Sequence, residues 1–227
     1  RVSILRQVEA VLMYAFSMAP IIGITADIIE NKHCVGVGYS EAIQKAGGIP
    51  VVLPPILGSE VKYIELCDGF VFTGGDDPIM EAFGEPTHPK AKKVHEQRQA
   101  FELSLLTKLQ ELPDVPVFGI CLGMQFLGLQ AGARLIQHLD DEMLSRHQSG
   151  EHEIASELGN GVVHTHHHQA LADAGSLDVI ARSEDGLIEG IADKQKPWYI
   201  GVQWHPERTE HTLLGQALFN DFVAAAT

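Results

Sequence analysis

The stretch from Pro116 to Gln125 (PVFGICLGMQ) places a cysteine where a predicted strand meets a predicted helix. Gly119 and Gly123 flank Cys121, and without β-carbons they permit the tight turn that lifts a nucleophile out of a sheet. The first turn of the helix would stabilise a thiolate through its dipole and its unpaired N–H groups. We therefore predict Cys121 to be a displayed nucleophile. The alternative is a buried structural cysteine before an ordinary core helix.

A histidine and a glutamate near the C-terminus supply the groups that such a cysteine needs. The apolar run over residues 201–204 is typical of a strand, and His205-Pro206-Glu207 follows it. The His205 imidazole can take the thiol proton, and the Glu207 carboxylate can fix the tautomer of the ring. Alone, a histidine at a strand end with a nearby glutamate is more often a surface pair.

A third strand end carries a turn without side chains. Residues 69–73 (GFVFT) predict a strand that runs directly into Gly74-Gly75. Such a backbone can approach a substrate closely and turn its N–H groups toward an oxyanion, with the N–H of Leu122 as second donor. A Gly-Gly pair is also an ordinary turn. Taken together, the three strand ends predict one site for covalent catalysis by a cysteine.

The elements that position these groups alternate along the chain from Pro20 onward. Short apolar runs alternate with helical periodicity, which is typical of a mostly parallel, doubly wound α/β sheet flanked by helices. We predict strands over 21–25, 49–53, 69–73 and 117–120, and helices over 39–46, 60–66, 95–111 and after Cys121. Residues 133–154 are predicted to be polar and irregular. Strand-like pieces, some antiparallel, are predicted over 161–165, 177–182, 186–191 and 198–204, before a last helix over 213–225.

Composition limits the class of protein. The 227 residues are 45% hydrophobic and 20% charged, and the formal net charge of −14 argues against nucleic acid or an anionic membrane as the main partner. Three widely spaced cysteines (Cys34, Cys67 and Cys121) form no disulfide framework, which favours a reducing compartment. We therefore expect a cytoplasmic protein with a single domain over residues 20–227.

The N-terminal extension, residues 1–19, is interpreted separately. Its apolar residues are spaced as on one face of a short amphipathic helix. The remnant of a signal peptide is the alternative, since basic residues precede a short apolar stretch.

The motifs together resemble the class I glutamine amidotransferase family. The likeness rests on GICLGMQ around Cys121, on WHPE around His205 and Glu207, and on FTGGDD after a strand. Three further stretches resemble the free-standing γ-glutamyl hydrolase branch, of the γ-glutamyl-GABA hydrolase type. These are residues 39–50 (YSEAIQKAGGIP), the turn His167-His168-Gln169, and residues 185–189 (DGLIE). The likeness extends from about Pro20 to the C-terminus and implies a flavodoxin-like three-layer sandwich.

The resemblance also implies roles for individual residues. Cys121 would attack a γ-glutamyl amide carbonyl, His205 would be general base and then general acid, and Glu207 would orient His205. Gly75 and Leu122 would form the oxyanion hole. The substrate-binding residues near the glutamyl end would be Gln125, His167, His168 and Gln169. The implied chemistry is acyl transfer through a γ-glutamyl thioester, with a small γ-glutamyl compound as partner and no cofactor.

The sequence departs from that branch just before the paired histidines, where His164-Thr165-His166 replaces an Asn-Ser-Tyr-like lead. This change leaves the exact substrate open. The run of histidines also raises a metal alternative, because His164, His166 and His168 would share a face of an extended strand. We expect no metal, since the resemblance accounts for two of the histidines and no cysteine or carboxylate cluster has ligand spacing. Asp76-Asp77 likewise belongs to the oxyanion turn in the resemblance.

A local basic patch covers residues 88–98 (HPKAKKVHEQR). We interpret it as a solvated loop and helix start. The functional alternative is that a lysine or arginine here attracts the substrate carboxylate, or that the loop covers the site.

Three functions remain open at this point. The first is a self-sufficient hydrolase of γ-glutamyl amides such as γ-glutamyl-GABA, favoured because no synthetase domain accompanies the motifs. The second is a glutaminase subunit that supplies ammonia to a partner synthase. The third is a binding module that kept the fold and lost catalysis. A homodimer also remains open.

Overall fold

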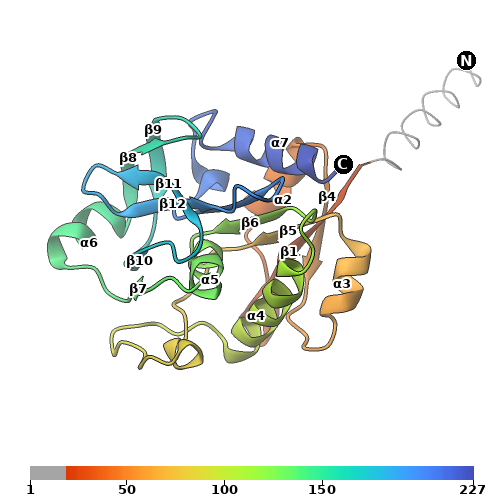
Figure 1. The fold of residues 1–227 in the computed structure, drawn as a ribbon, viewed down its shortest axis with the longest axis horizontal. Coiled ribbons are helices and arrows are strands. Elements are labelled where there is room, and N and C mark those ends of the chain that lie inside the picture. Colours follow the sequence, from red (N-terminus) through yellow and green to blue (C-terminus); the bar gives the residue numbers. More distant parts are fainter. Residues whose placement is uncertain (1–18) are drawn as a thin grey trace, which may run out of the picture.

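The computed structural model describes residues 19–227, and a long mixed sheet runs through them (Figure 1). The strands are β1 (Ile21–Thr25), β2 (Asp27–Ile29), β3 (Lys32–Cys34), β4 (Ile49–Leu53), β5 (Gly69–Phe72), β6 (Val117–Ile120), β7 (Leu135–Ile136), β8 (Gly150–Ser156), β9 (Gly161–Thr165), β10 (Ala170–Leu171), β11 (Asp178–Ser183), β12 (Ile188–Ala192) and β13 (Tyr199–Val202). The helices are α2 (Val37–Lys45), α3 (Glu60–Leu66), α4 (Glu96–Gln110), α5 (Leu122–Gln130), α6 (Asp141–His147) and α7 (Gln216–Ala225), with 3₁₀ turns η1 (Met80–Phe83) and η2 (Pro206–Arg208).

The sheet has a parallel half and an antiparallel half. Its order is β4-β1-β5-β6-β13-β12-β11-β8-β9. The first five strands in this order are parallel, and each strand from β12 onward pairs antiparallel with its neighbour. The register pairs Ile120 at the end of β6 with Val202 at the end of β13. The carboxyl ends of β5, β6 and β13 therefore share one edge, where ligands of open α/β sheets bind.

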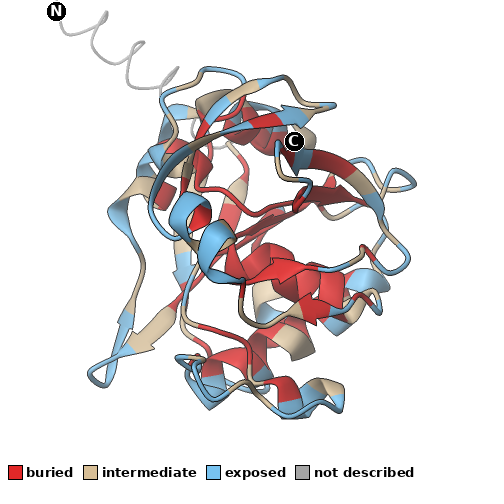
Figure 2. Cartoon of the chain, turned by 90° about the vertical axis from the view of Figure 1, so that its left-hand side faces the viewer, coloured by how far each residue is buried: buried red, intermediate tan, exposed pale blue. Residues whose placement is uncertain are grey.

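Helices cover both faces of the parallel half because side chains alternate across each strand. Phe70 and Phe72 of β5 pack with α3, α4 and α5, whereas Val71 between them packs with α2 and α7. Phe118 on β6 contacts Phe219 and Phe222 of α7, with ring centroids 5.4 and 5.8 Å apart. Figure 2 shows the buried residues along the sheet and on the inner sides of the helices. Burying each such phenylalanine contributes about 1.5–3 kcal/mol, so the core fixes the strand order.

The predicted fold class is confirmed: the structure is α/β with a mostly parallel central sheet, flanking helices and antiparallel strands in the C-terminal half. The predicted helices and strands before residue 131 are present, with bounds that differ by a few residues. The prediction for 133–154 was wrong, since β7, α6 and the start of β8 lie there. Strand β7 has only two residues, and polar side chains alternate with few buried ones in β8. Sequence reasoning also missed the β2-β3 hairpin, which holds only three residues per strand.

The prediction of a helix or signal remnant in the N-terminal extension falls almost entirely on residues 1–18, outside the described residues. Within the described part of the chain, no helix combines the length and apolar character needed to cross a bilayer.

Candidate active site

Cys121 lies at a strained junction between β6 and α5. Its backbone has φ 53° and ψ −105°, a conformation that costs on the order of 1–3 kcal/mol for a residue with a β-carbon. The flanking glycines are required by packing. A β-carbon on Gly123 would lie 2.2 Å from the Phe72 carbonyl oxygen, and one on Gly119 would lie 2.6 Å from Leu127 Cδ1. The strand and helix thus close on the junction and hold the cysteine at the N-terminus of α5.

The thiol is less exposed than the sequence predicts. Cys121 is only 6% exposed, so it is not displayed on an open surface. It contributes instead to the wall of a cavity of about 320 Å³ at the carboxyl edge of the sheet. Phe72, Phe118 and Ile120 around the junction are fully buried, which encloses the cysteine on the core side.

His205 and Glu207 form a buried pair just beyond β13. The ring nitrogen Nδ1 of His205 lies 2.8 Å from Glu207 Oε1, and both side chains are at most 6% exposed. Pro206 starts the short turn η2, which brings the carboxylate back toward the ring. The fit around Glu207 is tight, because a β-carbon on Gly38 would lie 3.2 Å from its Cγ. The other ring nitrogen, Nε2, has no hydrogen-bond partner among the described residues.

The pKa of His205 is about 9. Burial lowers this pKa, but the neighbouring Cys121 thiol and the Glu207 carboxylate raise it by more. The imidazolium is therefore the favoured form of His205 near neutral pH, beside the Cys121 sulfur. Such a pair combines a nucleophile with a proton donor.

Gly74, in the turn after β5, lies close to His205, Tyr39 and Cys121. A β-carbon on Gly74 would lie 3.0 Å from His205 Cε1, 3.1 Å from the Tyr39 hydroxyl and 3.5 Å from Cys121 Cβ. The backbone N–H of Gly74 donates to the Tyr39 hydroxyl at 3.1 Å. The structure thus brings the ends of β5, β6 and β13 together, as the shared edge of the sheet requires.

The Gly74-Gly75 turn is held from behind by Arg98. The guanidinium Nη2 donates to the Thr73 carbonyl at 2.9 Å and to the Gly74 carbonyl at 3.1 Å. A β-carbon on Gly75 would lie 2.3 Å from Arg98 Nη1 and 3.1 Å from Leu122 Cδ2. The turn therefore places Gly75 beside the first residue of α5, whose N–H has no partner within the helix.

Arg98 corrects the interpretation of the basic patch. It is fully buried and pairs with Glu102 at 2.8 Å and with Asp27 at 3.0 Å, so it is not part of a solvated helix start. Sequence reasoning missed Arg98 and Tyr39 as supports of the turn. The sequence did carry a signal for this burial. Arg98 and Glu102 are spaced i,i+4 on the side of the helix that also carries Phe101, Leu105 and Leu106. A charged residue on such an apolar side is rarely solvated.

The cavity collects all four residues that the resemblance assigns to the substrate. It is lined by Gly75, Asp76, Asp77, Lys92, Cys121, Gln125, Gln148, His166, His167, His168 and Gln169. Its volume is in the range of small-molecule sites. Lys92, from the basic patch, reaches the cavity and pairs with Asp76 at 3.0 Å. Gln148 lies in the segment predicted to be irregular, and sequence reasoning missed it.

Hydrogen bonds fix several of these side chains. His168 Nε2 lies 2.7 Å from Asp77 Oδ1, which joins the histidine turn to the glycine turn. This contact raises the pKa of His168 above its ordinary value, although burial lowers it. The Gln125 amide donates to Gln203 Oε1 at 3.2 Å, and the Gln169 amide donates to the Gln137 carbonyl at 2.9 Å.

The histidines raised as a metal alternative do not converge. Strand β9 ends at Thr165, so His164, His166 and His168 do not continue along one strand face. The His164 ring lies 6.2 Å from the His205 ring, between centroids, whereas His168 bonds Asp77. Within residues 19–227 the group with metal-ligand spacing is a different one, His147, His152 and Glu189.

Comparisons with known proteins agree with this fold. Residues 20–207 match the Peptidase C26 family. The chain is 34% identical to protein NtpR of Enterococcus hirae, over 82% of this chain and 87% of NtpR. It is 29% identical to the gamma-glutamyl-gamma-aminobutyrate hydrolase PuuD of Escherichia coli K12, over 82% of this chain and 84% of that protein. A glutamine amidotransferase from Thermotoga maritima superposes with a TM-score of 0.61 at 15% identity, over 83% of this chain and 76% of that one.

The fold is therefore that of the class I glutamine amidotransferases, as expected from the sequence motifs. The chain belongs to the Peptidase C26 family, which groups it with hydrolases.

Proposed function

We propose that this protein is a cysteine-dependent hydrolase that cleaves the γ-glutamyl amide bond of a small γ-glutamyl compound. The observation that carries the proposal is the position of Cys121, at its strained junction in the cavity wall, beside the buried His205–Glu207 pair, with Gly74 in close contact with both Cys121 and His205. The similarity to a gamma-glutamyl-gamma-aminobutyrate hydrolase supports the substrate class.

The proposed reaction has two halves. The Cys121 thiolate attacks the amide carbonyl, and the N–H groups of Gly75 and Leu122 stabilise the oxyanion of the tetrahedral intermediate. As the C–N bond breaks, the leaving amine takes a proton from the His205 imidazolium, and a γ-glutamyl thioester remains on Cys121. Water then gives a proton to His205 and attacks the thioester, which releases glutamate and restores the thiolate–imidazolium pair.

The other residues have supporting roles in this proposal. Glu207 keeps the Nδ1 proton of His205 in place and stabilises the imidazolium. Gln125 and the turn over His167, His168 and Gln169 would contact the glutamyl end of the substrate, since they line the same cavity as the thiol. Lys92 adds a positive charge at the cavity that suits a substrate carboxylate.

The test is glutamate release from a panel of γ-glutamyl amides, glutamine included, by the purified protein. We expect turnover of γ-glutamyl amines, and a loss of about 10⁴-fold or more in Cys121→Ala. Cys34→Ala, at a partly exposed cysteine outside the cavity, is the matched control and should retain activity.

Two other outcomes would favour the alternatives. Weak turnover confined to glutamine, with strong stimulation by an added synthase, would identify a glutaminase subunit. Equal activity in Cys121→Ala would contradict the role of Cys121 as the nucleophile. No turnover together with an unreactive thiol would contradict the hydrolase and leave a binding module.

A further inference from the structure

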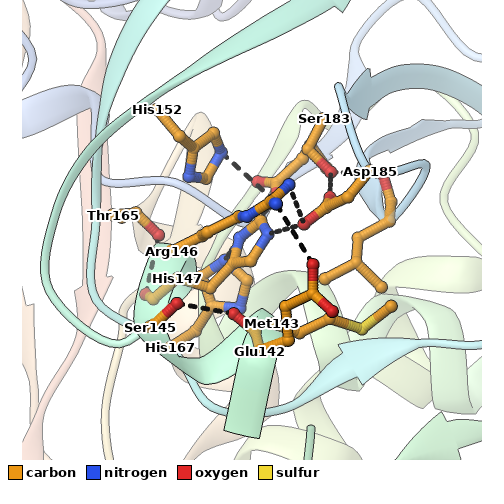
Figure 3. A network of polar contacts seen from close by, with 12 residues as sticks. Glu142, Met143, Ser145, Arg146, His147, His152, Thr165, His167, Ser183 and Asp185 are labelled. Atoms are coloured by element: carbon orange, nitrogen blue, oxygen red, sulfur yellow. Dashed lines mark hydrogen bonds and ion pairs between the residues drawn. The ribbon is translucent and has the colours of Figure 1, made fainter. Parts of the chain in front are cut away.

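A second group of ionisable side chains lies behind the histidine turn. His147 ends α6, His152 is on β8, His167 follows β9, and Glu189 is on β12. Glu189 is fully buried, and the side chains of His147, His167 and His152 are 1%, 2% and 11% exposed. Figure 3 shows the three rings close together, with Asp185 beside His147. Four segments that are distant in sequence thus bring three imidazoles to one carboxylate.

Each of the three rings places one nitrogen at the same distance from one oxygen of Glu189. Glu189 Oε1 lies 3.4 Å from His147 Nδ1, 3.4 Å from His152 Nε2 and 3.4 Å from His167 Nε2. His147 Nδ1 and His167 Nε2 are 3.3 Å apart. In a tetrahedral site with metal–ligand distances of about 2.0–2.1 Å, neighbouring ligand atoms lie roughly 3.3–3.4 Å apart. These contacts therefore have the edge length of a zinc tetrahedron.

In His147 and His167, the ring nitrogen that points away from Glu189 has a hydrogen-bond partner, and this partner determines whether the nitrogen facing Glu189 carries a proton or a lone pair. His147 Nε2 lies 3.0 Å from Asp185 Oδ2, and His167 Nδ1 lies 2.9 Å from the Gln169 carbonyl oxygen. A neutral ring that donates from that nitrogen presents a lone pair at the other one. His147 Nδ1 and His167 Nε2 then point lone pairs at the Glu189 carboxylate, and a cation must lie between them.

A proton and a metal ion are the two candidates for that cation. A proton would draw nitrogen and oxygen to about 2.7–2.9 Å, the length of a charge-assisted hydrogen bond. The observed contacts are longer, and neither Glu189 oxygen has a hydrogen-bond partner in the described part of the chain. The distances favour a metal.

We propose that His147, His152, His167 and Glu189 bind a divalent transition-metal ion of the zinc type. Three imidazoles and one carboxylate are ligands that Zn²⁺ accepts in proteins, and Asp185 would orient His147 from outside the ligand set. A cavity of about 30 Å³ lies against two of these ligands, His147 and His152, and against Asp185.

The ion would serve the active site indirectly. His167 also lines the cavity that holds Cys121, and His168 next to it bonds Asp77 on the opposite wall. Binding would therefore tie α6, β8 and β12 to the turn that faces the substrate. The expected role is structural support of that wall rather than a step in catalysis.

The experiment uses the full chain, treated with a chelator, dialysed and titrated with Co²⁺ as a spectroscopic substitute for Zn²⁺. We expect about one equivalent of Co²⁺, with the visible absorption of a four-coordinate ion, displaced by Zn²⁺. His147→Gln and Glu189→Gln should lose it. His88→Gln is the matched control, since His88 stacks on His138 in a surface histidine pair, and Cys121→Ala should also retain the ion.

His147→Gln and Glu189→Gln change buried residues and could prevent folding, so two milder variants are also tested. His152→Gln changes the most exposed of the four ligands, and Asp185→Asn changes only the outer support, where about a 10- to 100-fold loss of affinity is expected. Circular dichroism verifies that each variant is folded. Two results would overturn the proposal. One is wild-type protein that takes up no Co²⁺ or Zn²⁺, and the other is metal affinity equal to that of the wild type in folded His152→Gln and Asp185→Asn.

Discussion

The molecule has two histidine–carboxylate groups, one in the candidate active site and one behind the histidine turn, and they are built differently. His205 and Glu207 are two residues apart in sequence and 2.8 Å apart in space. Glu189 lies 3.4 Å from each of three histidines, which come from positions 22 to 42 residues away along the chain. The first group has the length of a charge-assisted hydrogen bond, and the second has the spacing of ligands around an ion.

The difference reflects the two halves of the sheet. In the parallel half, residues just after the strands at one edge carry Cys121, His205 and Glu207, so short motifs suffice to bring them together. In the antiparallel half, side chains from a helix, a turn and two strands meet behind the edge and form a buried cluster. Under the proposed function, one half supplies the reacting groups and the other the wall against which the substrate would lie.

The largest expected effect is at the short pair. Glu207→Gln removes the charge that orients His205, and the expected loss of kcat for γ-glutamyl amide hydrolysis is roughly 10²- to 10⁴-fold. Glu210→Gln is the control, because it makes the same change at an exposed glutamate three residues further along the chain. Steady-state kinetics measures both. Unchanged activity in Glu207→Gln would show that the pair is structural and remove the contrast between the two groups.

Arg98 provides the reference for a conventional buried ion pair in the same molecule. Arg98→Met leaves Glu102 without its partner in a site with no exposure, and the expected destabilisation is about 3–5 kcal/mol. Chemical denaturation measures it. The double variant Arg98→Met/Glu102→Met should recover part of that loss, because it also removes the unpaired charge. A single variant as stable as the wild type would contradict the role of Arg98 in holding the glycine turn.

The third prediction concerns the pH dependence of kcat/KM, which depends on the protonation of His205. The pKa of His205 is about 9, so the imidazolium that donates to the leaving amine is present at neutral pH and is lost as the pH rises through about 9. We expect kcat/KM to fall above that pH, about tenfold per unit. Glu207→Gln should move the fall to lower pH, since it removes one of the groups that raise the pKa. A fall centred near pH 7 in the wild type would contradict this assignment.

The smallest expected effect concerns the contact between His168 and Asp77, which joins the two walls of the cavity. The pKa of His168 is raised by Asp77, so this bond stabilises the fold fully below the unfolded value of about 6.5 and loses its effect as the pH rises through the folded value. Asp77→Asn should therefore cost on the order of 1 kcal/mol at pH 5.5 and less at pH 8.5. Thermal denaturation at the two pH values tests it. An equal cost at both would show that the bond does not depend on charge.

The contiguous motifs allowed much to be predicted. The strand before Cys121, the glycine turn and the His205 stretch lie at strand ends that the alternating pattern locates, and the fold class follows from that alternation. The short elements between 133 and 154 were missed because two-residue strands and a seven-residue helix leave no clear periodicity. Arg98 was assigned to a solvated patch because the run of charges over residues 88–98 outweighed its place on the apolar side of the helix.

The sequence by itself determined the order of the longer helices and strands, the glycines that fit a strained junction, and the local pair of His205 and Glu207. These depend on neighbours in the chain, so backbone geometry and periodicity settle them. Only the tertiary structure decided the burial of Cys121, the support of the glycine turn by Arg98, and the gathering of His147, His152 and His167 on Glu189. Those contacts join segments that are distant along the chain, and the packing of the sheet alone brings them together.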